Sequence, residues 1–201
     1  MALQQVQLYD NPGIITTKLP ENIFSQLRSC VRTTLNSPVE YNEHLIGQME
    51  EEYTLPVPTS ILEYLSVVCR EYQELFGYKL SKRPKFTDVW VNMQKKHEYN
   101  PNHQHYKDIG WVVWINIPYK LEDEFNHLNC KKTNKKRNSL FEFVYSKLSG
   151  EISTHQILVD KTYEGTLLMF PGTVRHSVYP FYTSEGYRIS VAGNIDLVNG
   201  Q

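Results

Sequence analysis

The sequence lacks the features of a secreted, membrane-bound or disulfide-rich protein. It contains only three cysteines, Cys30, Cys69 and Cys130, an odd number without the spacing of a metal site. The N-terminus has no basic segment followed by an apolar run, and no stretch reaches the length of a membrane span. We therefore expect a soluble, cytoplasmic protein with reduced thiols and no membrane partner.

An excess of charge of either sign is also missing. The chain has 21 Lys and Arg residues against 22 Asp and Glu residues, which gives a net charge of −1. This balance argues against extended binding to nucleic acid, so we expect no nucleic-acid partner. The one basic cluster, at 131–137, lies in a polar segment at 126–139 that we interpret as a surface loop; contact with an acidic partner is the alternative.

The period of the apolar residues changes from helical to strand-like near residue 83. Helical spacing occurs at 19–35 and 57–77, and Gly77 can close the second helix in a left-handed conformation. Strand-like runs follow at 86–95, 108–119, 140–148, 153–160, 165–172, 176–182 and 187–195. The order predicts an α+β, mainly β protein with one domain, 1–201. Its helical part is expected at 1–82 and an antiparallel sandwich or barrel at 83–198.

Two histidines stand one residue apart in PNHQHYKDIGWVVWINIPY, at 101–119, just before a long apolar strand. Alternation in an extended segment places His103 and His105 on the same face, so that two imidazole nitrogens can converge on one metal ion. The alternative is a polar loop that contains two solvated histidines.

Two later strands each have a polar face. In YRISVAGNI, at 187–195, one face carries Arg188, Ser190, Ala192 and Asn194, and in FTDVWVNMQK one face carries Trp90, Asn92 and Gln94. Buried polar groups need partners, and a cavity that binds an anion would supply them. Exposure of these faces to water on an outer sheet is the alternative.

The order of these features suits an open iron site. His103 and His105 are followed by His176, and Arg188 stands twelve positions after His176. Non-heme iron needs a few nitrogen and oxygen ligands beside vacant positions, and a carboxylate-bearing co-substrate needs a guanidinium group to hold its far end. The chain offers both parts.

Three segments give the chain a resemblance to a known family: WVNMQKKHEYNPNHQH, GWVVWINIPY and EGTLLMFPGTVRHSVYPFYTSEGYRIS. The chain resembles the 2-oxoglutarate- and Fe(II)-dependent oxygenases, in particular a small kind found in marine phages. The pattern covers most of the chain from Trp90 to Ile195, and LIGQMEEEY with the helix after it resembles the N-terminal part of the same group. The pairing of FPGTVRH with YRIS is the most specific piece.

The resemblance implies a fold, an activity and a set of site residues. The fold is a double-stranded β-helix, or jelly roll, with N-terminal helices packed on it. His176 is the distal iron ligand, Arg188 holds the C5 carboxylate of 2-oxoglutarate, Ser190 accompanies that arginine, and Asn92 and Asn194 line the cavity. The implied activity is hydroxylation of a protein residue or small molecule with dioxygen and 2-oxoglutarate, in the host cytoplasm if the protein is viral.

The chain departs from the family at one motif. The usual motif is His-x-Asp or His-x-Glu, whereas this chain has His103-Gln104-His105. Either both histidines bind the metal together with His176, or only one does, and Asp108 is an alternative source of an oxygen ligand. An imidazole in place of a carboxylate makes the site more positive by one charge.

Two other functions compete with the oxygenase interpretation. A cupin-like enzyme would use the same three histidines for iron, zinc or manganese without 2-oxoglutarate, and would give Arg188 no compulsory role. A jelly-roll module without catalysis would bind no metal and would serve in assembly or in interaction with a partner. The sequence does not choose a substrate, because one fold supports many substrates.

Overall fold

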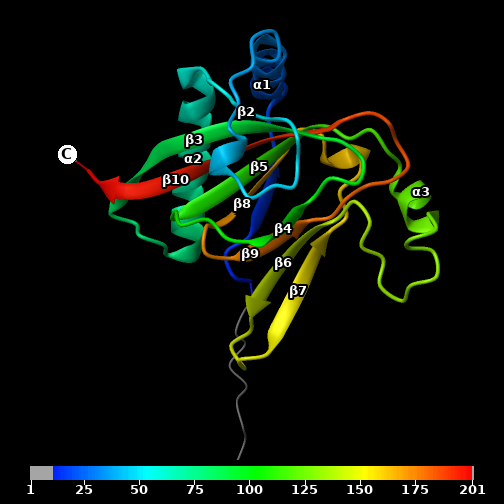
Figure 1. Ribbon diagram of the computed structural model, residues 1–201. Helices are drawn as coiled ribbons and strands as arrows, with labels where there is room; N and C mark the ends of the chain where they lie inside the picture. Colours follow the sequence, from blue (N-terminus) through cyan, green and yellow to red (C-terminus); the bar gives the residue numbers. More distant parts are fainter. Residues whose placement is uncertain (1–10, 201) are drawn as a thin grey trace, which may run out of the picture.

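Two antiparallel sheets face each other in the computed structural model, which describes residues 11–200 (Figure 1). The larger sheet has the order β1 (Ile15–Lys18), β8 (Thr166–Pro171), β5 (Ile109–Asn116), β10 (Arg188–Asn199), β3 (Lys82–Gln94) and β2 (Glu52–Thr54). The smaller sheet has the order β4 (Asn100–His103), β9 (Arg175–Val178), β6 (Phe141–Ser146) and β7 (Ile152–Ile157). Each of the seven expected strand-like runs overlaps one of these strands.

Two long helices cover the outer face of the larger sheet (Figure 1). They are α1 (Glu21–Thr34) and α2 (Thr59–Phe76), close to the predicted ranges, and Gly77 ends α2 with a φ of 60° as expected. The N-terminal part also supplies β1 and β2 and a short 3-10 helix at Asn42–His44. A second 3-10 helix, at Lys161–Tyr163, precedes β8. The predicted runs do not include β1, β2 or β4, because strands of three or four residues carry too little periodicity. None of the described helices combines the length and apolar character of a membrane span.

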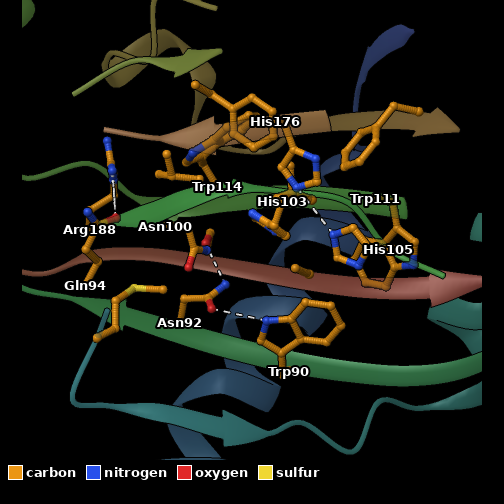
Figure 2. Close-up of a pocket in the computed structure, with 17 residues that line it drawn as sticks. Trp90, Asn92, Gln94, Asn100, His103, His105, Trp111, Trp114, His176 and Arg188 are labelled. Carbon is orange, nitrogen blue, oxygen red and sulfur yellow. Dashed lines mark hydrogen bonds between the residues drawn. The ribbon is translucent and has the colours of Figure 1, made fainter. Parts of the chain in front are cut away.

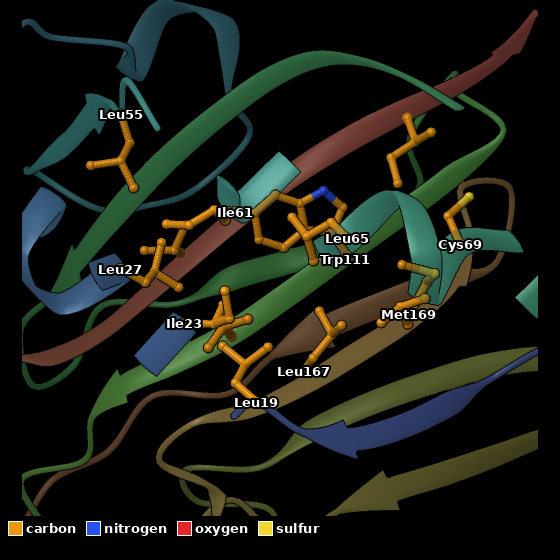
Figure 3. Close-up of a cluster of buried hydrophobic side chains, with 14 of the residues drawn as sticks. Leu19, Ile23, Leu27, Leu55, Ile61, Leu65, Cys69, Trp111, Leu167 and Met169 are labelled. Atoms are coloured by element: carbon orange, nitrogen blue, oxygen red, sulfur yellow. The ribbon is translucent and has the colours of Figure 1, made fainter. Parts of the chain in front are cut away.

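Alternation along the central strands divides the interior into two apolar clusters. Val91, Val113 and Val191 point to the helices and pack in the cluster shown in Figure 3, whereas Val112 and Trp114 point to the smaller sheet. The predicted faces of β3 and β10 are therefore confirmed. The space between the two sheets receives the polar faces of both strands.

The polar segment at 126–139 is only partly a surface loop. It follows α3 (Leu121–Asn126), and Lys131, Lys132 and Lys135 at its centre are exposed as expected. Its end is different, because Asn138 and Ser139 are buried and Ser139 has a φ of 62°. Cys130 is buried as well. The end of this segment therefore belongs to the interior of the protein, which its composition did not reveal.

Leu65 tests how strongly α2 contributes to stability. Its side chain is 1% exposed between α2 and the larger sheet. Leu65→Ala should lower the free energy of unfolding by about 2–5 kcal/mol, because the lost apolar contacts leave a cavity. Val67→Ala on the same helix removes a side chain that is 56% exposed and should cost less than about 0.5 kcal/mol. Chemical denaturation measures both, and equal losses would contradict the packing described.

Candidate metal centre and co-substrate cavity

A cavity lies between the two sheets (Figure 2). Its lining comes from β3 (Trp90, Asn92, Gln94), β10 (Arg188, Ser190, Ala192), β5 (Trp111, Val112, Trp114), β8 (Phe170), β4 (Asn100, His103), β9 (His176, Val178) and β6 (Phe141), with Met49 and His105 from loops. Figure 2 shows the three histidines toward one side of this cavity and Arg188 toward the other.

The structure brings His103, His105 and His176 together. Each can offer one nitrogen, and these atoms lie within 4.8 Å of one another. His103 is opposite His176 in the pairing of β4 with β9, and His105 Nε2 lies 3.3 Å from His176 Nε2. The arrangement follows from the alternation expected for His-x-His, while only the fold adds the third histidine.

Contacts with backbone carbonyl groups orient the rings of His103 and His176. His103 Nδ1 lies 2.8 Å from the carbonyl oxygen of Pro101, and His176 Nδ1 lies 3.1 Å from that of Val174. A carbonyl can only accept, so each Nδ1 carries the proton and each Nε2 keeps a free lone pair. The His176 ring also stacks on Phe141, at 5.2 Å between centroids. These are the contacts that hold a metal-binding imidazole in place.

The three imidazoles are neutral at physiological pH. Burial lowers the pKa of His105 to about 4, assisted by the nearby His103, and it also lowers the pKa of His103 and His176. Neutral imidazole is the form that binds a transition metal. The donor set therefore fits a ferrous ion, for which imidazole is a suitable ligand, with nitrogen ligands on one side only.

Asp108 does not join the histidines. Its carboxylate forms an ion pair with Lys79 and accepts a hydrogen bond from the backbone N–H of Leu197 at 2.7 Å. Among residues 11–200, the metal-binding cluster around His176 contains histidines alone. The alternative in which Asp108 supplies an oxygen ligand is thus not supported, because its two oxygens are engaged elsewhere.

Arg188 is buried at the other side of the cavity, with 2% exposure. Its Nε and Nη2 donate to Gln94 Oε1 at 2.9 and 2.6 Å. Nη1 donates to the Tyr119 hydroxyl at 3.0 Å and to the Ser139 carbonyl at 2.6 Å, and Nη2 also donates to the Tyr179 carbonyl at 2.7 Å. A buried guanidinium is tolerated because each of its donors has a partner.

The remaining predicted residues divide between the cavity and its surroundings. Asn92 and Ser190 face each other across β3 and β10, and Asn92 Nδ2 donates to Ser190 Oγ at 3.2 Å. Trp90 Nε1 in turn donates to Asn92 Oδ1 at 3.1 Å. Asn194 is not part of the cavity lining; its side chain lies beside His105 and works against the lowering of that pKa.

Several functional candidates escaped the sequence analysis. Gln94 was on the expected polar face but had no assigned role, and Tyr119 and Ser139 gave no signal because they reach Arg188 from distant segments. Glu52 and Asn100 were also missed. Glu52 is 1% exposed, and burial together with the charge of Glu98 raises its pKa to about 7.

The chain belongs to a family of iron-dependent oxygenases. Residues 88–194 match the family described as "Putative 2OG-Fe(II) oxygenase", which is more than half of the chain and contains the three histidines and Arg188. No curated protein is significantly similar to the chain.

Solved structures with the same fold include prolyl hydroxylases. A prolyl-4-hydroxylase from Pseudomonas putida has a TM-score of 0.56 at 12% identity, with 94% of each chain covered. A viral collagen prolyl hydroxylase from Paramecium Bursaria Chlorella virus-1 has a TM-score of 0.53 at 13% identity, with 92% of this chain and 97% of that chain covered. A prolyl hydroxylase from Trichoplax adhaerens, solved with a hypoxia inducible factor peptide fragment, has a TM-score of 0.56 at 10% identity. The match covers 92% of this chain and 84% of that chain. These likenesses confirm the double-stranded β-helix.

Family membership makes the protein a 2-oxoglutarate- and Fe(II)-dependent oxygenase. Its cofactors are Fe(II) and the co-substrate 2-oxoglutarate, and dioxygen is the second co-substrate. The cupin-like function without 2-oxoglutarate and the module without catalysis are therefore set aside.

Glu52 generates a prediction for the pH dependence of stability. Glutamate in an unfolded chain has a pKa near 4.5, whereas that of folded Glu52 is about 7. Between these values the folded state binds more protons, so the free energy of unfolding falls as pH rises. The advantage of Glu52→Gln over wild type should grow by about 3 kcal/mol from pH 4.5 to pH 8. Chemical denaturation across this range measures the difference, and parallel profiles for the two proteins would contradict the buried, unpaired state of Glu52.

Proposed function

We propose that His103, His105 and His176 bind Fe(II) through their Nε2 atoms, with one imidazole in place of the family's carboxylate. The observation that carries this assignment is the convergence of the three ligand nitrogens within 4.8 Å, with His176 buried, His103 and His105 half-buried, and the pKa of all three lowered. Three neutral ligands leave the full charge of the metal in the cavity, which favours an anionic co-substrate beside it.

We also propose that Arg188 holds the C5 carboxylate of 2-oxoglutarate. Arg188, the first residue of β10, lines the same cavity as the three histidines. Its Nε and Nη2 both donate to the one Gln94 oxygen, and this pair of donors has the geometry of the fork that binds a carboxylate. The co-substrate would then displace Gln94 Oε1 and leave the contacts of Arg188 with Tyr119, Ser139 and Tyr179 in place.

The other lining residues would position the co-substrate and exclude water. Ser190 and Asn92 lie between Arg188 and the histidines along β10 and β3, and their mutual hydrogen bond fixes both side chains. Trp90 and Trp114 supply apolar walls, and Trp111 borders the cavity while it also packs in the apolar cluster on the helix side. With Fe(II) and 2-oxoglutarate bound, dioxygen would supply the oxidising power for hydroxylation of a substrate C–H bond, and 2-oxoglutarate would be oxidised at the same time.

The substrate class is a protein residue or a small molecule. A neighbour in fold from Trichoplax adhaerens binds a peptide fragment, which is compatible with a peptide substrate here. We also propose a cytoplasmic location, which the three free cysteines support.

The first test is anaerobic titration of the protein with Fe(II) and then 2-oxoglutarate. A visible charge-transfer band should appear when the 2-oxo acid chelates the metal. His176→Ala should weaken Fe(II) binding by more than about 100-fold and abolish the band. The loss of a ligand should exceed the loss of a residue that only hydrogen-bonds to a ligand, which already lowers metal affinity by about 10–100-fold. His44→Ala removes an exposed imidazole and serves as the control. A band of wild-type strength in His176→Ala would refute the ligand assignment.

Arg188→Ala separates the co-substrate from the metal. This variant should bind Fe(II) as wild type does and lose at least about tenfold in affinity for 2-oxoglutarate, because a charge-assisted pair is removed. Since Ala leaves the buried partners of Arg188 unpaired, Arg188→Lys is measured beside it; it keeps the charge without the fork and should fall between Ala and wild type. Wild-type affinity for 2-oxoglutarate in both variants would exclude the proposed role.

The unusual motif can be tested by restoring the family's carboxylate. His105→Asp still offers three ligands, so it should bind Fe(II) within about tenfold of wild type, whereas His105→Ala should lose more than about tenfold. Equilibrium competition with a metal chelator measures both. If His105→Ala binds Fe(II) as tightly as wild type, only His103 and His176 are ligands.

A further inference from the structure

A second polar site adjoins the cavity at β2. Glu52 stands directly opposite Asn92 in the antiparallel pairing of β2 with β3. Residues opposite each other in antiparallel strands project to the same face of the sheet, and Asn92 projects into the cavity. Glu52 therefore extends the polar face of the larger sheet beyond Asn92, on the side away from the sheet centre.

Both oxygens of Glu52 lack a hydrogen-bond donor among residues 11–200, and so does Asn100 Oδ1. All three atoms are buried. Asn100 comes from β4 of the smaller sheet, three residues before His103, and it lines the cavity. Buried polar atoms in native proteins are nearly always paired, so three orphaned acceptors from two facing sheets need an explanation.

Two of the unpaired acceptors lie close together beside Gly47. A Cβ atom placed on Gly47 would lie 2.7 Å from Glu52 Oε1 and 2.7 Å from Asn100 Oδ1. The two oxygens, which come from different sheets, thus approach the same side of Gly47, and a side chain on this residue would fill the gap between them. One donor group placed between the two oxygens could reach both.

Among residues 11–200, the charge that acts on these acceptors is negative. The nearby charge that acts on Glu52 is Glu98, which is also acidic. Lys95 is directed to Glu50 and Glu51 instead, at 2.7 and 2.8 Å. An ionised Glu52 carboxylate can only accept hydrogen bonds, and so can Oδ1 of Asn100. The ligand that suits these oxygens is therefore a cationic group rich in N–H donors.

We propose that Glu52 and Asn100 bind a cationic nitrogen group of the substrate, a protonated amine or a guanidinium. This inference rests on the proposed function, since it assigns the substrate of the same cavity. Met49 and Trp90 provide apolar surface for the stem that carries the charge. The cation would be held close to β4, whose last residue is the metal ligand His103, so that a carbon of the same substrate can lie near the metal.

Binding of matched probes tests the proposal. The protein is loaded anaerobically with Mn(II) and 2-oxoglutarate, and calorimetry measures the binding of two pairs of probes. The first pair is Nα-acetyl-lysine amide and Nα-acetyl-norleucine amide, and the second is Nα-acetyl-arginine amide and Nα-acetyl-citrulline amide. The cationic member of at least one pair should bind at least about tenfold tighter, the equivalent of one charge-assisted hydrogen bond. Free lysine and arginine are titrated in parallel, and tighter binding of the free amino acid would indicate a small-molecule substrate.

Two variants place the effect at this site. Glu52→Gln should reduce the cation preference to less than about twofold, whereas Glu50→Gln, which changes an exposed carboxylate, should keep it. Gly47→Ala introduces a methyl group at the shared point and should weaken the cationic probes at least about tenfold. It provides a second test if Glu52→Gln does not fold, as judged by circular dichroism.

Equal or undetectable binding of both members of each pair would overturn the proposal, and so would a preference that survives both variants. Such a result would mean that Glu52 and Asn100 share only a proton or a buried water. The Fe(II)–2-oxoglutarate band, recorded on the same preparations, separates the two levels. A normal band without cation preference removes this inference alone, whereas absence of the band removes the proposed function.

Discussion

Strand β10 carries the constraint on which the rest of the structure depends, because its two faces serve different purposes. Val191 and Ile195 are fully buried against the helices, and Arg188 and Ser190 face the cavity. Pairing with β3 on one side and β5 on the other fixes this register along both edges. A slip by one residue would move Arg188 into the apolar cluster and a valine into the cavity, so the fold and the site require the same register.

Most polar groups in the interior have hydrogen-bond partners, and the groups that lack a partner indicate where a ligand can bind. Arg188 reaches acceptors from four segments, the histidines are neutral, and carbonyl groups orient His103 and His176. Within residues 11–200, the carboxylate oxygens of Glu52 and Oδ1 of Asn100 have no such partners. The cavity therefore combines a histidine side with an arginine side, and the acidic Glu52 adjoins it, which suits a co-substrate and a substrate of opposite charge.

Much of the fold could be predicted because alternation in a strand and the helical period are local properties. The faces of β3 and β10, the two helices and the left-handed Gly77 all follow from neighbouring residues. The short strands β1 and β2 could not be predicted, since the pairing of a few residues with a distant strand leaves no local pattern. The buried end of the polar segment at 126–139 was missed for the same reason: Ser139 is buried because Arg188 and Pro180 bond to its backbone.

By itself the sequence determined which side chains can act: two histidines on one face, a third after a strand end, and an arginine on a polar strand face. Only the tertiary structure decided which of them meet. It gathered three imidazoles, paired Asp108 with Lys79, and brought Glu52 and Asn100 from two sheets together beside Gly47. The physical reason is that strand pairing and sheet packing, which join residues far apart in the chain, place these groups in one cavity, whereas local periodicity fixes only the face from which each group projects.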